Sequence, residues 1–181
     1  MPGRPSAGKP ARRLRAANLA GAWALAVADA ADDAVHAALG QGGAAPAALV
    51  AIHDSPGQSI ERLRPTLGLS QPGAARLVDR LVAAGWVRRS RGADARTAAL
   101  SLTVAGRRVV ARILRERERR LERLLDPLSD EQADQLAELL GAMLRSQTHD
   151  DHDLRRLCRL CDRPVCDACP VAEGARLSGA D

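Results

Sequence analysis

The sequence predicts a mainly α-helical protein with a small β-wing, which together form a winged helix-turn-helix with an added helical dimerisation region. Three observations predict this class. Two short helical patterns are joined by a tight turn at Gly68, as in a helix-turn-helix. Two short strand patterns then flank a polar loop that contains arginine. Finally, long helical patterns lie on both sides of this central part of the chain.

The composition allows a sizeable core and favours a nucleic-acid partner. Hydrophobic residues make up 46% of the chain, but there is no Phe or Tyr and there are only two Trp, so the core is built from Leu, Val and Ala. The scarcity of aromatic side chains argues against stacking platforms for single strands. The formal net charge is +5, and Lys9 is the only lysine among the basic residues. Arginine binds phosphate and guanine through a bidentate fork that lysine lacks.

The N-terminal part combines a short tail with one long helix. Residues 1–10 are rich in Pro, Gly and Ser and are predicted to be a disordered tail. A helix over 11–39 follows, with an apolar stripe at steps of three and four that comprises Leu19, Trp23, Val27, Ala30 and Ala34. A basic lead followed by an apolar run is also typical of a signal peptide, but the helical pattern continues well beyond the cleavage-like site. No apolar run reaches the roughly 18 residues of a membrane span. We therefore expect a cytoplasmic protein with no membrane partner.

Local signals place the elements of the helix-turn-helix. Pro46 opens a helix through about residue 53, and Ser59 caps a second one over 60–67. Pro65 lies inside this second helix, which is unfavourable unless the helix bends or ends there. Ser70 caps the next helix, which Gly85 ends.

The wing and the C-terminal helices follow in the same way. Strands are predicted over 86–90 and 97–102, with the wing tip at 91–95. Thr103 caps a helix over 105–126, and Ser129 with Gln132 forms a capping box for another helix. That last helix carries a continuous apolar stripe from Ala133 to Leu144.

The long terminal helices have more apolar surface than a small winged helix can cover. We therefore expect a homodimer in which the first helix and the last two helices of each chain interleave. A twofold dimer would present two recognition helices to a pseudo-palindromic duplex. The alternative is a monomeric bundle in which these helices fold back on their own chain.

Residues 11–147 resemble the MarR-type transcriptional regulators. The resemblance is strongest in LGLSQPGAARLVDRL (67–81), GWVRR (85–89), the Asp94-x-Arg96 pattern of the wing and LTVAG (102–106). It implies dimers that bind palindromic operators in double-stranded DNA, and in many members a small-molecule effector, an oxidant or a metal controls binding. The chain departs from the family pattern at Arg64, Pro65 and Gly73.

The candidate DNA-binding residues lie on the recognition helix and the wing. By the resemblance, Ser70, Gln71, Pro72 and Arg76 face the major groove, while Arg96, held by Asp94, enters the minor groove. The full predicted set is Ser70, Gln71, Pro72, Gly73, Arg76, Arg80, Arg88, Arg89, Arg91, Asp94 and Arg96.

All four cysteines of the chain lie within 12 residues, in the predicted C-terminal tail over 148–181. Cys158, Cys161, Cys166 and Cys169 form two Cys-x-x-Cys pairs separated by four residues. Two such pairs supply four thiolates to one tetrahedral ion, so we expect a structural zinc knuckle. An iron–sulfur cluster, a thiol redox switch and an exposed tail with reduced thiols are the alternatives.

No catalytic constellation is visible, because the sequence has no nucleophile–base arrangement and no Gly-rich phosphate loop. The sequence therefore predicts a dimeric DNA-binding regulator, taken to be a repressor, that responds to a small ligand, a metal or a redox signal. A thiol–disulfide or iron–sulfur redox protein and a winged helix used only for protein interaction are the competing interpretations. The wing arginines argue against the latter, because an interaction surface does not need them.

Overall fold

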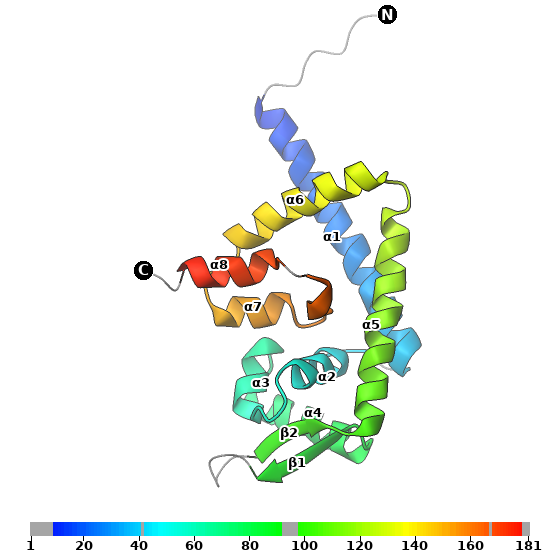
Figure 1. The fold of residues 1–181 in the computed structure, drawn as a ribbon, viewed down its shortest axis with the longest axis vertical. Helices are drawn as coiled ribbons and strands as arrows, with labels where there is room; N and C mark the ends of the chain where they lie inside the picture. The colour runs from blue at the N-terminus through cyan, green and yellow to red at the C-terminus, as the bar shows by residue number, and fades with distance from the viewer. Residues whose placement is uncertain (1–8, 41, 92–97, 167, 179–181) are drawn as a thin grey trace, which may run out of the picture.

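The computed structural model describes residues 9–40, 42–91, 98–166 and 168–178 (Figure 1). The order of elements confirms the mainly helical class with a two-stranded wing. The elements are α1 (Lys9–Leu39), α2 (Ala45–Asp54), α3 (Ile60–Thr66), α4 (Gln71–Ala83), β1 (Val87–Arg91), β2 (Ala98–Leu102), α5 (Val104–Leu125), α6 (Asp130–Ser146), α7 (Asp151–Leu157), the 3-10 helix η1 (Arg163–Val165) and α8 (Pro170–Ser178). The boundaries predicted up to α6 agree to within about two residues. Helices α7, η1 and α8 lie in the region predicted only as a cysteine-rich tail.

The core lies where α2, α3, α4 and the two strands meet the first half of α5, a group of elements that we call the winged-helix unit. Its apolar faces follow the helical spacing of the sequence, because residues three and four apart share one side of a helix. The predicted inner face of α4 is buried at Leu77, Val78 and Leu81. The largest side chains that pack with it are Leu49, Ile52, Leu63, Leu100, Val110 and Ile113.

Two caps and two glycines shape the helix-turn-helix. Ser59 and Ser70 are the N-caps of α3 and α4, and each hydroxyl accepts a hydrogen bond from the backbone N–H three residues on. Gly68 lies between the helices at φ +64° and Gly85 follows α4 at φ +72°, a backbone region that favours glycine. Pro65 lies inside α3, which ends one residue later at Thr66.

The wing is a two-stranded antiparallel sheet in which Val87 pairs with Leu102 and Arg91 with Ala98. Its inner strand is also held by the loop before α3, because Gly57 N donates to Leu100 O at 2.7 Å and Leu100 N donates to Gln58 O at 3.0 Å. The wing is therefore attached to the helix-turn-helix through backbone hydrogen bonds as well as through its apolar side chains.

Thr103 joins the wing, α4 and α5. Its hydroxyl donates to Gly85 O at 2.7 Å and accepts from Gly106 N at 3.0 Å, while its own N–H donates to Trp86 O. The helix start comes so close to the turn that a Cβ at Gly106 would lie 2.0 Å from Trp86 O. This contact explains why the motif at 102–106 requires a capping residue and a glycine.

The first helix packs along α5 through its C-terminal half, while its N-terminal half projects beyond the winged-helix unit (Figure 1). Ala34 and Val35 are buried there, whereas Leu19 is 58% exposed and Trp23 is 36% exposed. The N-terminal part of the apolar stripe predicted for this helix, at Leu19 and Trp23, is therefore not covered by its own chain.

The region after α6 folds into helices that pack on the rest of the molecule. Helix α6 begins with the predicted capping box, in which Ser129 and Gln132 exchange hydrogen bonds. The C-terminal hairpin, which we define as α7, η1 and α8 with their connections, returns toward the centre so that α8 packs on α6 and α7 contacts α3 (Figure 1). The segment around the cysteines is thus attached at two places.

None of the helices in the described part of the chain is both long and apolar enough for a membrane span.

We expect Gly106→Ala to lower the free energy of unfolding by about 1–3 kcal/mol, the usual cost of overpacking, because the added methyl group collides with backbone. Chemical denaturation monitored by circular dichroism measures this change. Arg108→Ala, on the exposed side of the same helix, is the control and should change stability by less than about 0.5 kcal/mol. Equal stabilities of the two variants would contradict the close approach of α5 to the Trp86 turn.

Candidate nucleic-acid interface and cysteine cluster

The start of α4 presents a polar surface that the rest of the chain leaves open. Gln71, Pro72, Arg76 and Arg80 are exposed, on the side of the helix opposite its buried leucines. Ser70 is also exposed, but its hydroxyl accepts from Gly73 N at 3.3 Å and so caps the helix. The buried side of α4 packs on the core of the winged-helix unit, while its N-terminal turns face solvent.

The wing adds arginines beside this helix. Arg88, Arg89 and Arg91 lie on β1 and are exposed. Arg89 forms an ion pair with Asp79 of α4, with 2.8 Å between Nη2 and Oδ1. No local sequence pattern indicates this pair, because it depends on how the strand packs across the helix.

The other predicted wing residues, Asp94 and Arg96, lie outside the described residues, so their roles stay predictions. The structure therefore brings together nine of the eleven predicted residues on α4 and β1, namely Ser70, Gln71, Pro72, Gly73, Arg76, Arg80, Arg88, Arg89 and Arg91.

The four cysteines come together in the C-terminal hairpin. Cys158 is the C-cap of α7, and Cys161 N donates to Cys158 O at 3.0 Å, so the first pair shares one turn. Cys169 directly precedes α8. All four line one cavity of about 350 Å³, whose other walls are Leu144, Leu154, Arg163, Pro170, Val171, Ala172 and Arg176. Cys158 is 5% exposed, whereas Cys166 is open to solvent.

The first pair consists of two unlike thiols. The hydrogen bond between Cys158 and Cys161 raises the pKa of Cys158, and burial raises it further. The same hydrogen bond lowers the pKa of Cys161 to about 6, assisted by the positive charges of Arg117 and Arg163. Burial raises the pKa of Cys166, and the neighbouring Cys161 adds to this. This hydrogen bond therefore favours the thiolate form at Cys161 over that at Cys158.

Within the described residues, no group of three or more His, Cys, Asp or Glu side chains has an arrangement that could hold a metal ion. The cysteines share a cavity without forming a closed ligand set. His149 and His152, upstream of the cluster, lie at the start of the hairpin and are exposed.

The cysteine cluster is attached directly to the winged-helix unit. Arg163, between the two pairs, makes an ion pair with Asp54 of α2, with 2.9 Å between Nε and Oδ2. Asp54 is partly buried, and desolvation raises its pKa while Arg163 lowers it. Cys158 also lies beside Ala51 and Thr66, which line the same small cavity. Apart from the arginine in the cysteine loop, no local pattern in the sequence indicates these contacts.

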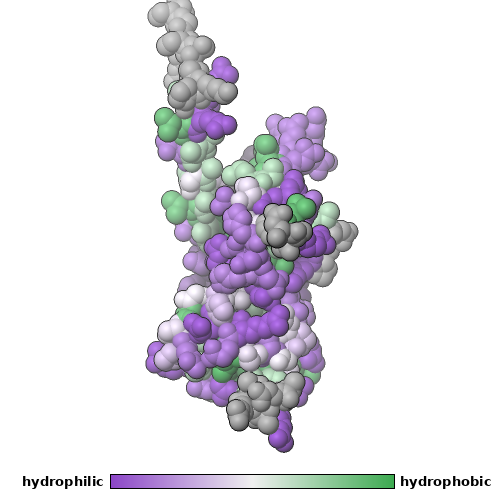
Figure 2. Space-filling model, turned by 90° about the vertical axis from the view of Figure 1, so that its left-hand side faces the viewer, coloured by the Kyte–Doolittle hydropathy of each residue, from purple (hydrophilic) through white to green (hydrophobic). Residues whose placement is uncertain are grey.

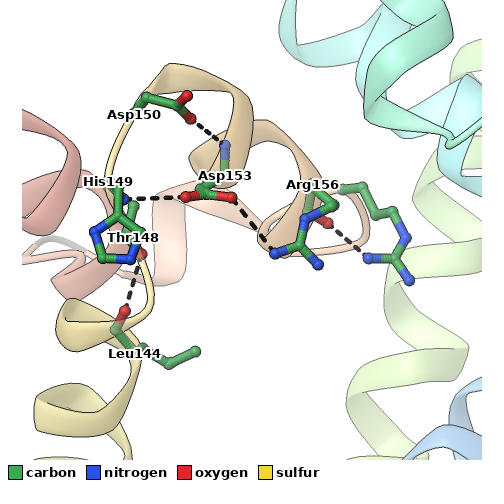
Figure 3. A network of polar contacts seen from close by, with 7 residues as sticks. Leu144, Thr148, His149, Asp150, Asp153 and Arg156 are labelled. Atoms are coloured by element: carbon green, nitrogen blue, oxygen red, sulfur yellow. Dashed lines mark hydrogen bonds and ion pairs between the residues drawn. The ribbon is translucent and has the colours of Figure 1, made fainter.

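A polar network fixes the turn between α6 and α7 (Figure 3). Thr148 Oγ1 donates to Leu144 O at 2.9 Å, and His149 N donates to Asp153 Oδ2 at 3.1 Å. Asp150 caps α7 by accepting from Asp153 N at 2.8 Å. The hydrogen bond from the His149 backbone lowers the pKa of Asp153. These contacts set the direction in which the hairpin leaves α6.

The arrangement of a capped, solvent-facing helix beside an arginine-bearing wing defines the winged helix-turn-helix class. Residues 42–97 match the model of the MarR family. The match covers the helix-turn-helix and the first strand of the wing and ends before β2, and it confirms the family resemblance. Among curated proteins, none matches the chain.

Solved structures share the fold at low sequence identity. MarR from Escherichia coli in its apo form is 22% identical with a TM-score of 0.58, over 68% of this chain and 96% of that one. MepR, a transcription regulator of the Staphylococcus aureus multidrug efflux pump MepA, is 20% identical with a TM-score of 0.62, over 72% and 96%. RV1404 from Mycobacterium tuberculosis is 20% identical with a TM-score of 0.62, over 77% and 95%. The fold is that of MarR-family transcription regulators.

We expect Ser70→Ala to lower the free energy of unfolding by about 0.5–2 kcal/mol, because α4 loses its N-cap hydrogen bond. Denaturant unfolding measures this difference. Gln71→Ala, at the next position and equally exposed, removes no cap and should leave stability unchanged to within about 0.5 kcal/mol. A Ser70→Ala variant as stable as the wild type would show that the hydroxyl does not serve as the cap.

Proposed function

We propose that the protein is a homodimeric transcription regulator that binds a pseudo-palindromic site in double-stranded DNA, and that it is not an enzyme. The observation that carries the proposal is the open N-terminal surface of α4, where Gln71 and Arg76 project from a helix whose opposite side is buried. A protruding helix of this kind fits the major groove, and Arg or Gln there can read guanine or adenine. We further propose repression, because occupying promoter DNA is sufficient to block transcription.

The charge distribution supports a DNA partner. Arg88 and Arg91 extend the exposed surface of α4 along the wing and carry no acidic partner among the ion pairs described. They are placed to contact phosphates on either side of the groove. Arg89 serves a different role in this proposal, because its ion pair with Asp79 holds the wing at a fixed angle to the recognition helix.

Uncovered apolar side chains support the homodimer. Leu14, Leu19 and Leu25 of α1 are exposed, as are Leu139 and Met143 of α6. Figure 2 shows apolar patches on the projecting part of α1, just below the grey N-terminal residues. A soluble protein rarely leaves such surface on two helices without a partner. Interleaving these helices with those of a second copy would cover both faces and place two copies of α4 on one side of the dimer.

A cavity between α1 and the winged-helix unit supports control by a small ligand. It has a volume of about 260 Å³ and is lined by Asp32, Val35, Gly43, Ala44, Pro46, Ala47, Leu67, Arg159 and Leu160. Typical ligand pockets measure about 300–1,000 Å³, so a small effector fits this one best. A ligand here would touch the dimerisation helix, the winged-helix unit and the C-terminal hairpin at once.

We expect Arg76→Ala to reduce the discrimination between a selected operator duplex and a scrambled duplex by about 1–3 kcal/mol, because one base contact is lost. Fluorescence anisotropy with both duplexes, at two or more salt concentrations, measures this. Arg112→Ala removes the same charge from an exposed position on α5 and should keep the wild-type discrimination. If the wild type itself does not distinguish the duplexes, sequence-specific binding is excluded.

We expect Leu139→Glu to weaken the dimer by at least about tenfold, because burying an unpaired carboxylate in an apolar interface costs more than the 1.4 kcal/mol that corresponds to that factor. Light scattering during gel filtration should move from twice the 19.1 kDa protomer mass toward the protomer mass. Leu177→Glu on α8 is the matched control, because both leucines are 65% exposed. A monomeric wild type, or equal masses for the two variants, would refute the proposed interface.

A further inference from the structure

We propose that Cys158, Cys161, Cys166 and Cys169 bind one Zn²⁺ ion and that the bound ion fixes the C-terminal hairpin on the winged-helix unit. The proposal goes beyond DNA recognition, and neither part of it depends on whether the protein binds DNA.

The two cysteine pairs converge. They lie at the two ends of the connection between α7 and α8: Cys158 follows α7 as its C-cap, and Cys169 precedes α8, where its carbonyl accepts from Glu173 N at 3.0 Å. The fold nevertheless places all four side chains on the wall of one cavity. The chain has no other cysteine, so every thiol of the protein meets at this place. Four thiolates complete the tetrahedral coordination of a structural Zn²⁺ ion.

Positive charge surrounds the cysteine cluster. Four thiolates around one Zn²⁺ ion leave a net charge of −2, which needs compensation when partly buried. Arg163 and Arg176 line the same cavity, and Arg117 of α5 lies close enough to act on Cys161. The arginines come from three different elements. They place positive charge around the thiols. Neutral side chains packed only by apolar contacts would need no such charge.

Cys166 is the thiol that lies apart from the others. The side chain of Cys158 is within hydrogen-bonding reach of both Cys161 and Cys169, so the two pairs already meet at Cys158. Cys166 is exposed, and the described side chains form no ready-made ligand set. The cavity of about 350 Å³ leaves room for an ion beside these thiols, and in the proposal Cys166 turns toward it to complete the ligand set. The binding energy of the ion supplies the driving force, as in other small domains whose folding is coupled to metal binding.

The cysteine cluster is attached to the winged-helix unit, so an ion bound there can fix the hairpin on that unit. Arg163 stands between the pairs and holds Asp54 of α2 at 2.9 Å, and Cys158 packs beside Ala51 and Thr66 of α2 and α3. Closing the loop around an ion therefore immobilises Arg163 and tightens the contact of the hairpin with the winged-helix unit. Removing the ion releases the same contact.

Metal analysis of full-length protein, purified anaerobically without added chelator, tests the site. We expect one zinc per protomer by mass spectrometry, no visible absorbance, and loss of most of the zinc in Cys161→Ser and in Cys166→Ser. His149→Ala is the matched control, since this residue lies at the start of the same hairpin and is excluded from the ligand set. Because the serine variants can misfold, zinc is also stripped from the wild type with a mercurial and a chelator, and we expect re-addition of Zn²⁺ alone to restore one equivalent.

Three results would overturn the site: metal-free protein with four freely titrating thiols that takes up no added zinc, brown protein containing iron, or protein isolated with Cys158 and Cys161 joined in a disulfide. Zinc retained in both serine variants would overturn the ligand assignment.

Hydrogen exchange measures the coupling without DNA. We expect zinc to slow amide exchange in α2 and α3 by about fivefold or more relative to zinc-stripped protein, the lower end of common coupling energies. Arg163→Gln should keep one zinc per protomer and lose most of this protection, because the link to Asp54 is broken. Exchange in α2 and α3 that is equal with and without zinc would overturn the coupling, whatever the DNA-binding experiments show.

Discussion

The hydrogen bonds of Thr103 are the contact on which the geometry of the winged-helix unit depends. A single side chain ends the wing, caps α5 and bonds to the turn that follows α4. The recognition helix, the wing and the long helix α5 therefore share one fixed point. Gly106 allows the backbone of α5 to approach the Trp86 carbonyl, which no larger residue could do without displacement. The angle between α4 and the wing follows from this junction, and the ion pair between Asp79 and Arg89 reinforces it at the surface.

This rigidity matters for the proposed recognition of DNA. A surface that reads a groove needs side chains held at defined positions, because each freely rotating group must be ordered on binding. In α4 the buried face, the N-cap and the glycine turns fix the backbone, so only the exposed side chains remain to be ordered. The same helix directs its polar residues outward because its leucines point inward.

The C-terminal hairpin adds a second level of organisation. It contacts α3 and α6 and reaches Asp54 of α2 through Arg163. It therefore bridges the winged-helix unit and the helices proposed for dimerisation. A signal received in the hairpin, whether a metal ion at the cysteines or a small ligand in the neighbouring cavity, would act on both regions at once. In the proposed mechanism, regulation requires no long-range pathway, because the sensing groups touch the parts that would move.

Local structure could be predicted from the residues alone. Caps at Ser70, Thr103 and Ser129, the glycine at 85 and the apolar spacing of α4 specify where elements begin, end and face, because these signals act within a few residues of the chain. The cysteine spacing likewise indicated a candidate metal site. The contacts between distant segments came from the packing of the folded chain: the Asp79–Arg89 pair, the convergence of the two cysteine pairs on one cavity and the ion pair of Arg163 with Asp54. Such contacts depend on how whole elements pack, and no local pattern specifies that. For the same reason the apolar stripe of α1 was recognisable in the sequence, but its exposure became visible only when the fold showed that its own chain leaves it uncovered.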